Sequence, residues 1–147
     1  MIANEPLIHL VDDELEIRTL YKKLFETRGY SLQTYVSAEE FLGTKLEIRT
    51  GCILLDFNLP NMNGLELQKE LKTHAYQLPI IFMSGQPDIA PAVDSVLSGT
   101  VRYIQKPARI ADVVRQVNLA ISRSEVILSK YQSRILLPIG KRRLPII

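Results

Sequence analysis

Polar residues stand at the ends of four short apolar runs in this sequence. The runs LIHLV, CILL, LPIIFM and VRYIQ lead directly into Asp12 and Asp13, Asp56, Ser84, and Lys106, respectively. A buried, unpaired carboxylate is costly, so we expect Asp56 either at an exposed strand end or beside charged partners. If the runs are parallel strands, their carboxyl ends meet at one rim of a sheet and bring these five side chains together.

Three carboxylates at one rim favour a bound cation. Each pair would repel by roughly 4 kcal/mol at a few ångströms for an effective dielectric of about 20, so the three would hardly stay ionised together without a positive charge. The expected ligands are Asp13, Asp56, the backbone carbonyl near Asn58, and Asp12 directly or through water. Such an all-oxygen site suits Mg²⁺. Zinc is not favoured, because the sequence has no Cys/His cluster and His9 is better explained as a packed or rim histidine.

With the cation in place, Asp56 can act as an oxygen nucleophile toward a phosphoryl group and form an aspartyl phosphate. Mg²⁺ and the Lys106 ammonium would neutralise the phosphoryl oxygens, and the Ser84 hydroxyl can donate a hydrogen bond to one of them. Any one of these residues alone is more often a turn, a surface charge or a helix cap. Their joint occurrence at strand ends favours the functional interpretation.

The elements that must position these residues alternate along the chain. The pattern predicts strands at 7–11, 31–35, 52–56, 78–83 and 101–105. It predicts helices over 14–28, after Ser37, after Gly64, over about 89–98, and from near Ile110. The first helix is expected to bury a stripe made by Leu15, Leu20, Leu24 and Phe25. Ser37 and Glu40 have the spacing of a capping box.

Five strands alternating with five helices predict an α/β fold. We expect a doubly wound, five-stranded parallel sheet with helices on both faces and the flavodoxin-like strand order 2-1-3-4-5. In such a sheet, ligands bind outside the carboxyl ends of the strands. The predicted rim of polar side chains lies at that edge.

Composition restricts the class of protein. The chain has 147 residues, 46% of them hydrophobic, which suffices for one domain with a real core. A formal net charge of +2 does not indicate nucleic-acid binding by the domain as a whole. The single cysteine, Cys52, lies in an apolar run and is expected to be a buried thiol in a reducing compartment. The absence of a bilayer-length apolar stretch and of a signal peptide predicts a cytoplasmic protein with no membrane contact.

The sequence resembles the receiver domains of two-component response regulators over residues 5 to about 124. HLVDDE is similar to the acidic pocket of that family, and LLDFNLPNMNG to its phosphorylation loop with Asp56 as the acceptor. IFMSG resembles the fourth strand with Ser84 as the switch hydroxyl, and YIQKP the fifth strand with Lys106. The segments VDDE, LPNMNGLELQ and MSGQPDI are most similar to nitrogen-fixation-type regulators, which usually add a helix-turn-helix output domain.

The resemblance implies a phosphorylation-activated switch rather than an enzyme with an outside substrate. A sensor histidine kinase or phosphotransfer protein would supply the phosphoryl group, and the domain would catalyse only its own phosphorylation and dephosphorylation. Tyr103 is implied as the rotameric switch aromatic, and the Lys106-Pro107 bond is expected to be cis. The implied output is altered binding to an unknown downstream protein through the face of the fourth helix, fifth strand and fifth helix.

Three interpretations remain open at this point. A stand-alone receiver is favoured because too few residues follow the fifth helix for an output domain. The alternative is a receiver fragment of a longer DNA-binding transcription regulator. The third is a phosphohydrolase of the haloacid-dehalogenase type, which is disfavoured because that family needs an acidic residue where Asn58 stands. Ala108 also departs from the apolar residue that commonly follows the proline in receivers.

The chain is expected to divide into a receiver domain at 1–124 and an extended fifth helix with a basic and apolar tail at 125–147. An apolar stripe continues past the domain to Leu128, Tyr131 and Ile135, with Ser124 as a polar member. Because no residue of the domain is expected to cover these three, the stripe predicts a homodimer through parallel helices. The tail, with Lys141–Arg143, is interpreted as solvated and not as a nucleic-acid or membrane contact.

Overall fold

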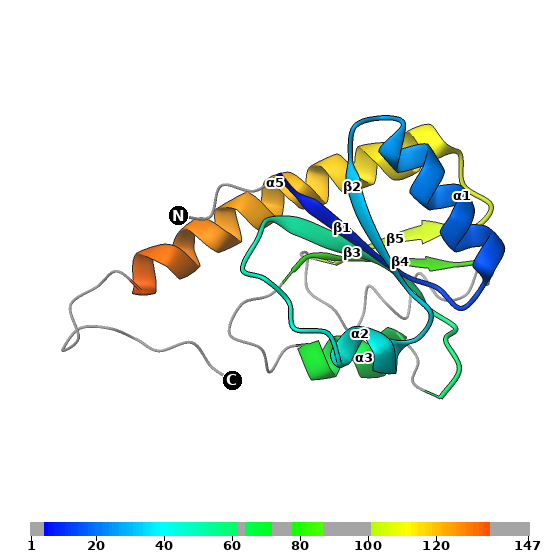
Figure 1. Ribbon diagram of the computed structural model, residues 1–147, viewed down its shortest axis with the longest axis horizontal. Coiled ribbons are helices and arrows are strands. Elements are labelled where there is room, and N and C mark those ends of the chain that lie inside the picture. The colour runs from blue at the N-terminus through cyan, green and yellow to red at the C-terminus, as the bar shows by residue number, and fades with distance from the viewer. Residues whose placement is uncertain (1–4, 62–63, 72–77, 87–100, 136–147) are drawn as a thin grey trace.

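The computed structural model describes residues 5–61, 64–71, 78–86 and 101–135 (Figure 1). Its strands are β1 (Leu7–Val11), β2 (Ser31–Tyr35), β3 (Gly51–Asp56), β4 (Ile80–Ser84) and β5 (Val101–Gln105). Its helices are α1 (Leu15–Glu26), α2 (Ala38–Leu42), α3 (Gly64–Leu71) and α5 (Ile110–Ile135). The helix predicted over about 89–98 and the basic tail lie outside the described residues.

The strands form one parallel sheet in the order β2-β1-β3-β4-β5, which confirms the predicted topology. β3 is the middle strand, and every one of its residues is buried. β4 begins two residues later than predicted because Pro79 has no N–H to donate to the sheet. Ser84 is the last residue of β4 and lies opposite Gln105 of β5.

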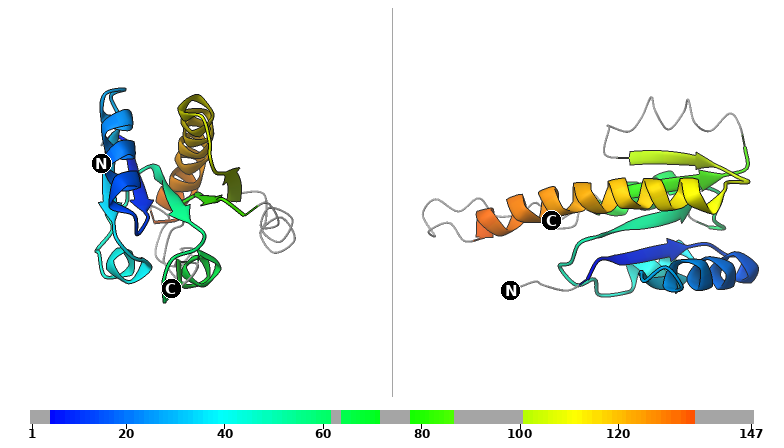
Figure 2. Two further views of the ribbon diagram at one scale, coloured as in Figure 1. Left: turned by 90° about the vertical axis from the view of Figure 1, so that its right-hand side faces the viewer. Right: turned by 90° about the horizontal axis from the view of Figure 1, so that it is seen from above.

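The two faces of the sheet carry different helices. α1 and α5 cover one face, and α2 and α3 cover the other (Figures 1 and 2). Alternate strand residues divide between the two cores as the pleat requires: Leu54 faces α1 and α5, whereas Ile53 and Leu55 face α2 and α3. Cys52 is fully buried in the first core, and burial raises the pKa of its thiol to about 12, as expected for a structural cysteine.

The buried side of α1 differs from the predicted stripe. Leu15 and Leu20 are 67% and 50% exposed, whereas Tyr21 and Phe25 are buried and Ile17 packs beside them. These three follow the spacing of four residues that places side chains on one face of a helix. The prediction for Leu15 and Leu20 was wrong because leucines were favoured over the tyrosine. At α2, the Ser37 hydroxyl accepts a hydrogen bond from the Glu40 N–H, as the capping-box spacing predicted.

α5 continues as one helix to Ile135, and its second half extends past the strands (Figures 1 and 2). Ser124 is fully buried, and its hydroxyl accepts a hydrogen bond of 3.0 Å from the N–H of Gly51 at the start of β3. Leu128 is only 5% exposed. The expectation that this chain leaves Leu128 uncovered was therefore wrong. The side chains of Tyr131 and Ile135 lie outside the described residues.

Gly51 is required where β3 enters the sheet. A Cβ atom at this position would lie 1.9 Å from the carbonyl oxygen of Leu7 on β1. No side chain fits at that distance, and a substitution would force the two strands apart. The close approach of β1 and β3 at this end is thus set by a glycine, and the same residue donates to Ser124 of α5.

Candidate functional site

The carboxyl ends of the strands meet at one rim, as predicted. Asp56 ends β3, Ser84 ends β4, and the acidic residues follow β1 directly. Lys106 follows β5, and its N–H donates to the carbonyl of Ser84 at 2.8 Å. The structure therefore brings Asp12, Asp13, Asp56, Ser84 and Lys106 to one edge of the sheet.

Asp56 is a buried carboxylate with few compensating contacts. It is 7% exposed, and one of its oxygens accepts a hydrogen bond from the N–H of Asn58 at 3.1 Å. The Lys106 ammonium lies 4.0 Å from the other oxygen. Burial raises the pKa of the Asp56 carboxyl, and the Asn58 hydrogen bond and Lys106 oppose it only in part. The ionised form that a nucleophile needs is therefore costly unless a further positive charge arrives.

Lys106 is held by Asp12 more closely than by Asp56. Its Nζ atom lies 3.4 Å from Oδ2 of Asp12, which is 1% exposed. Burial alone would lower the pKa of Lys106, but the carboxylates of Asp12 and Asp56 outweigh it and raise the pKa. The lysine is thus charged and directed toward the rim at neutral pH. Arg18, which the sequence interpretation did not include, donates to the carbonyl oxygen of Asp12 at 2.8 Å.

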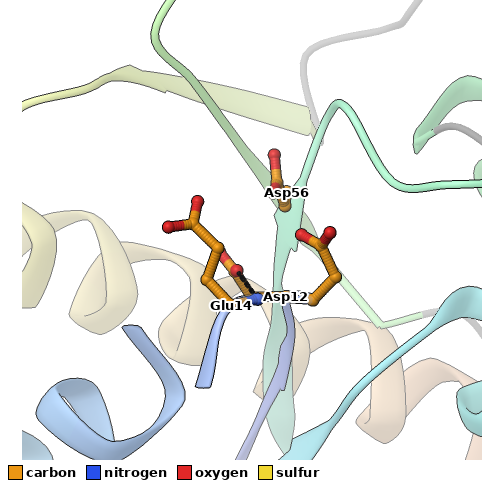
Figure 3. Close-up of side chains that lie close together, drawn as sticks. Asp12, Glu14 and Asp56 are labelled. Atoms are coloured by element: carbon orange, nitrogen blue, oxygen red, sulfur yellow. Dashed lines mark hydrogen bonds between the residues drawn. The ribbon is translucent and has the colours of Figure 1, made fainter. Parts of the chain in front are cut away.

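Four acidic side chains form a cluster at this rim. Asp12, Asp13, Glu14 and Asp56 each offer a carboxylate oxygen, and these oxygens all lie within 4.8 Å of one another. Figure 3 shows the carboxyl groups of Asp12, Glu14 and Asp56 close together above the strand ends. An all-carboxylate donor set with room for water fits a hard divalent cation such as Mg²⁺. Glu14 was missed from the sequence, although it directly follows the two predicted aspartates.

Ser84 and Tyr103 meet at the same residue, Gln86. The Ser84 hydroxyl accepts from the Gln86 N–H at 3.0 Å and lies 3.5 Å from the side-chain amide nitrogen of Asn58. The half-buried Tyr103 donates its hydroxyl to the Gln86 carbonyl at 3.0 Å. The two predicted switch residues are therefore connected through one peptide segment. Asn58 lies in the loop directly after β3, where its N–H donates to Asp56 and its side-chain amide approaches Ser84.

Two further predicted features lie directly after β5 and within β1. The Lys106-Pro107 peptide bond is cis. His9 lies on β1, is 6% exposed, and its Nδ1 atom is 2.9 Å from the Tyr35 hydroxyl. Burial lowers the pKa of His9 to about 4, with a smaller contribution from Arg49. His9 is a packed, neutral histidine, in agreement with its interpretation from the sequence.

Comparison with known proteins decides the family. Residues 8–118 match the family model described as the response regulator receiver domain. The chain belongs to the response regulator receiver family. Its relatives include the transcriptional regulatory protein TdiR of Thauera aromatica, which is 30% identical over 90% of this chain and 58% of its own length. The transcriptional regulatory protein FixJ of Azorhizobium caulinodans is 31% identical over 80% of this chain and 56% of its own length.

The receiver fold is also shared with solved structures. The FixJ-N crystal structure is 28% identical, covers 82% of this chain and 96% of its own chain, and has a TM-score of 0.72. This receiver spans about half the length of the curated relatives it matches, 51–58% for the first three. Within the described parts of the chain, no helix is long and apolar enough to cross a membrane. The match to the receiver family and the regulators among its relatives place the chain in two-component signalling.

Proposed function

We propose that this receiver is a phosphorylation-operated switch in which Asp56 accepts the phosphoryl group. The observation that carries the proposal is the position of Asp56. It is the buried carboxylate at the end of the middle strand, 4.0 Å from the Lys106 ammonium, and one of its oxygens lies within 4.8 Å of carboxylate oxygens of Asp12, Asp13 and Glu14. No other carboxylate of the cluster ends a strand and contacts both the lysine and the loop after β3.

The proposed reaction transfers one phosphoryl group. An ionised oxygen of Asp56 forms a bond to phosphorus while the bond between phosphorus and the donor's leaving group breaks, and the electron pair departs with that group. The product is an acyl phosphate. Lys106 binds the phosphoryl oxygens, and the Ser84 hydroxyl can turn from Gln86 to donate to one of them. Asp12, Asp13, Asp56 and the backbone carbonyl of Asn58 would hold Mg²⁺, which supplies positive charge to the reacting carboxylate and the phosphoryl oxygens when bound.

Mass spectrometry after incubation with acetyl phosphate and Mg²⁺ tests the acceptor. We expect the wild-type chain to gain one phosphoryl group that is lost on treatment with hydroxylamine, as acyl phosphates are. Asp56→Asn should abolish labelling. Asp112→Asn, in the first turn of α5, removes one half-exposed carboxylate outside the rim and should leave labelling unchanged. Undiminished labelling of Asp56→Asn would reject the assignment.

The phosphoryl donor and the downstream partner are proposed by class of protein. A sensor histidine kinase or phosphotransfer protein would supply the phosphoryl group, and the output would be altered binding of a partner protein on the face that includes β5 and α5. Because the matched relatives are named transcriptional regulators and are longer than this chain, a receiver within a longer transcription regulator is the second candidate. An immunoblot of the native protein, compared with this chain for size, distinguishes the two.

Homodimerisation through α5 has less support than the sequence stripe indicated. Leu128, one of its three supporting residues, is already buried in the single chain. The proposal is therefore tested directly by sedimentation velocity at high micromolar concentration, with and without phosphodonor. A chain that sediments as a monomer under both conditions would reject the dimer.

A further inference from the structure

Glu14 occupies the N-cap position of α1 but does not cap the helix. Its side chain makes no capping hydrogen bond to the first turn of α1. A carboxylate oxygen instead lies within 4.8 Å of oxygens of Asp12, Asp13 and Asp56. The side chain is therefore directed at the acidic rim rather than at its own helix.

Asp12 holds Glu14 in this place and is itself largely occupied. One oxygen of Asp12 accepts the Glu14 N–H at 2.9 Å, and the other accepts from Lys106 at 3.4 Å. The residue is 1% exposed, so neither oxygen is open to bulk water. Asp13 and Glu14, by contrast, are exposed. A hydrated cation approaching from solvent meets these two carboxylates first.

We propose that Glu14 is an additional acidic residue of the cation site. Both oxygens of Asp12 already accept hydrogen bonds, from Lys106 and from the Glu14 N–H, and Glu14 supplies a further carboxylate with its negative charge. The inference rests on the proposed function, since it concerns the same cation. Four carboxylates against one ammonium give the rim a formal charge of −3. A divalent cation therefore enters a site with one negative charge more than the aspartates alone provide.

Isothermal titration of the full chain with Mg²⁺, without any phosphodonor and at about 0.15 M salt to screen distant charges, tests the assignment. Glu14→Gln keeps the side-chain shape and removes the charge. We expect its Mg²⁺ affinity to fall roughly three- to ten-fold, the effect of losing one nearby, partly hydrated carboxylate. The matched control is Glu16→Gln, which removes the same charge from the exposed first turn of α1. Its affinity should change less than two-fold.

The comparison with Asp13→Asn separates two kinds of failure. If the wild-type chain binds Mg²⁺ and Asp13→Asn weakens binding, but Glu14→Gln behaves like Glu16→Gln, the role of Glu14 is rejected and the proposed function stands. If the wild-type chain does not bind Mg²⁺ at millimolar concentration, the cation site and this inference are both rejected. Circular dichroism of each variant checks that the fold is retained. A fall in Mg²⁺ affinity with Glu14→Gln, together with an unchanged affinity of Glu16→Gln, supports the proposal.

Discussion

The burial of Asp56 has a consequence for stability as well as for reactivity. An acid whose pKa is raised in the folded state binds more protons folded than unfolded at intermediate pH. The free energy of unfolding therefore falls as the pH rises through that window, and the ionised Asp56 destabilises the fold at neutral pH. Keeping Asp56 ionised in the folded state thus lowers the free energy of unfolding, and a bound cation or contacts to a phosphoryl group would offset this loss.

We expect Asp56→Asn to raise the melting temperature at pH 7 in the absence of Mg²⁺, because the amide removes the buried charge. The gain should shrink as the pH is lowered, since protonation of Asp56 then removes the same charge from the wild type. Differential scanning calorimetry between pH 4 and pH 7 measures this. Asp112→Asn serves as the control for a half-exposed carboxylate. An equal gain at all pH values would show that the charge of Asp56 is not its cause.

The different partners of Asp13 and Lys106 predict opposite effects on metal binding. Asp13→Ala should lower Mg²⁺ affinity by about an order of magnitude, because one of few carboxylate ligands is lost. Lys106→Ala should leave the affinity unchanged or higher, since a competing cation is removed from Asp12. The Mg²⁺ concentration for half-maximal change in amide resonances gives both values. If Lys106→Ala weakened binding as much as Asp13→Ala, the division of roles would be wrong.

The sequence predicts which residues reach the rim better than it predicts the groups that each of them contacts. Asp12, Asp13, Asp56, Ser84 and Lys106 could be found because each follows an apolar strand. Glu14 could not, because a glutamate at a helix start is more often a cap, and only the structure shows that it does not cap. The Asn58 contact with Ser84 depends on the loop after β3, whose course no spacing rule specifies.

Among the elements, the end of β4 and the middle of β5 are joined through the segment that contains Gln86. The Gln86 N–H now donates to Ser84, and the Gln86 carbonyl accepts from Tyr103. A phosphoryl group on Asp56, with a charge of about −1.5 to −2, would accept a hydrogen bond from the Ser84 O–H, and rotation of the Ser84 side chain toward it would carry Oγ away from the Gln86 N–H. The segment joining the two switch residues would then lose one of its hydrogen bonds.

We therefore expect phosphorylation to shift the amide resonance of Gln86 and those of β5, as well as the loop after β3. Heteronuclear NMR spectra recorded before and after addition of acetyl phosphate and Mg²⁺ measure the shifts. Asp56→Asn, treated identically, controls for binding of the donor and the metal alone. Shifts confined to residues 56–61, with Gln86 and β5 unchanged, would contradict this route.

The hydrogen bond between α5 and β3 is a second testable element contact. Ser124→Ala leaves the buried Gly51 N–H without its acceptor, which should lower the free energy of unfolding by about 1–3 kcal/mol. Ser129→Ala, at an exposed position on the same helix, should have little effect. Urea denaturation of both variants measures the difference. Equal stabilities would show that water or another group replaces the hydroxyl.

The positions of the elements followed from the sequence wherever the pattern of apolar residues allowed only one assignment. The strands were predicted closely because each buried run is short and bounded by turn residues. The buried face of α1 was not, because Leu20 and Tyr21 are neighbours and either can begin an apolar stripe; packing against the sheet selected Tyr21 and Phe25. Hydrophobicity alone does not rank such alternatives.

At the scale of the whole molecule, the strand order was predictable because alternating strands and helices leave few ways to cover a parallel sheet. The covering of α5 beyond the sheet was not, since it depends on contacts between parts of the chain that are far apart in sequence. Leu128 was expected to need a second copy, and its burial within one chain shows that the helix past the sheet is still part of the packed structure.

Leu128→Ala should therefore destabilise the monomer by about 2–5 kcal/mol, the range for removing a buried leucine side chain. Val126→Ala, at a position that is 48% exposed on the same helix, should cost much less. Thermal unfolding at low protein concentration, where self-association is negligible, compares them. Similar small losses in both variants would show that Leu128 contributes little to the fold of a single chain.

The buried hydroxyl of Ser124 also gives α5 a polar contact about which a tilt of the helix can be considered. It fixes the helix to the start of β3 at a point near its middle, with roughly 21 Å of helix before it and 16 Å after it at about 1.5 Å per residue. A rigid rod held at one interior point behaves as a lever. A tilt that moves the end beside Lys106 by about 1 Å would move the far end by about 0.8 Å in the opposite direction. Any such tilt would thus carry a displacement at the rim to the opposite end of the molecule.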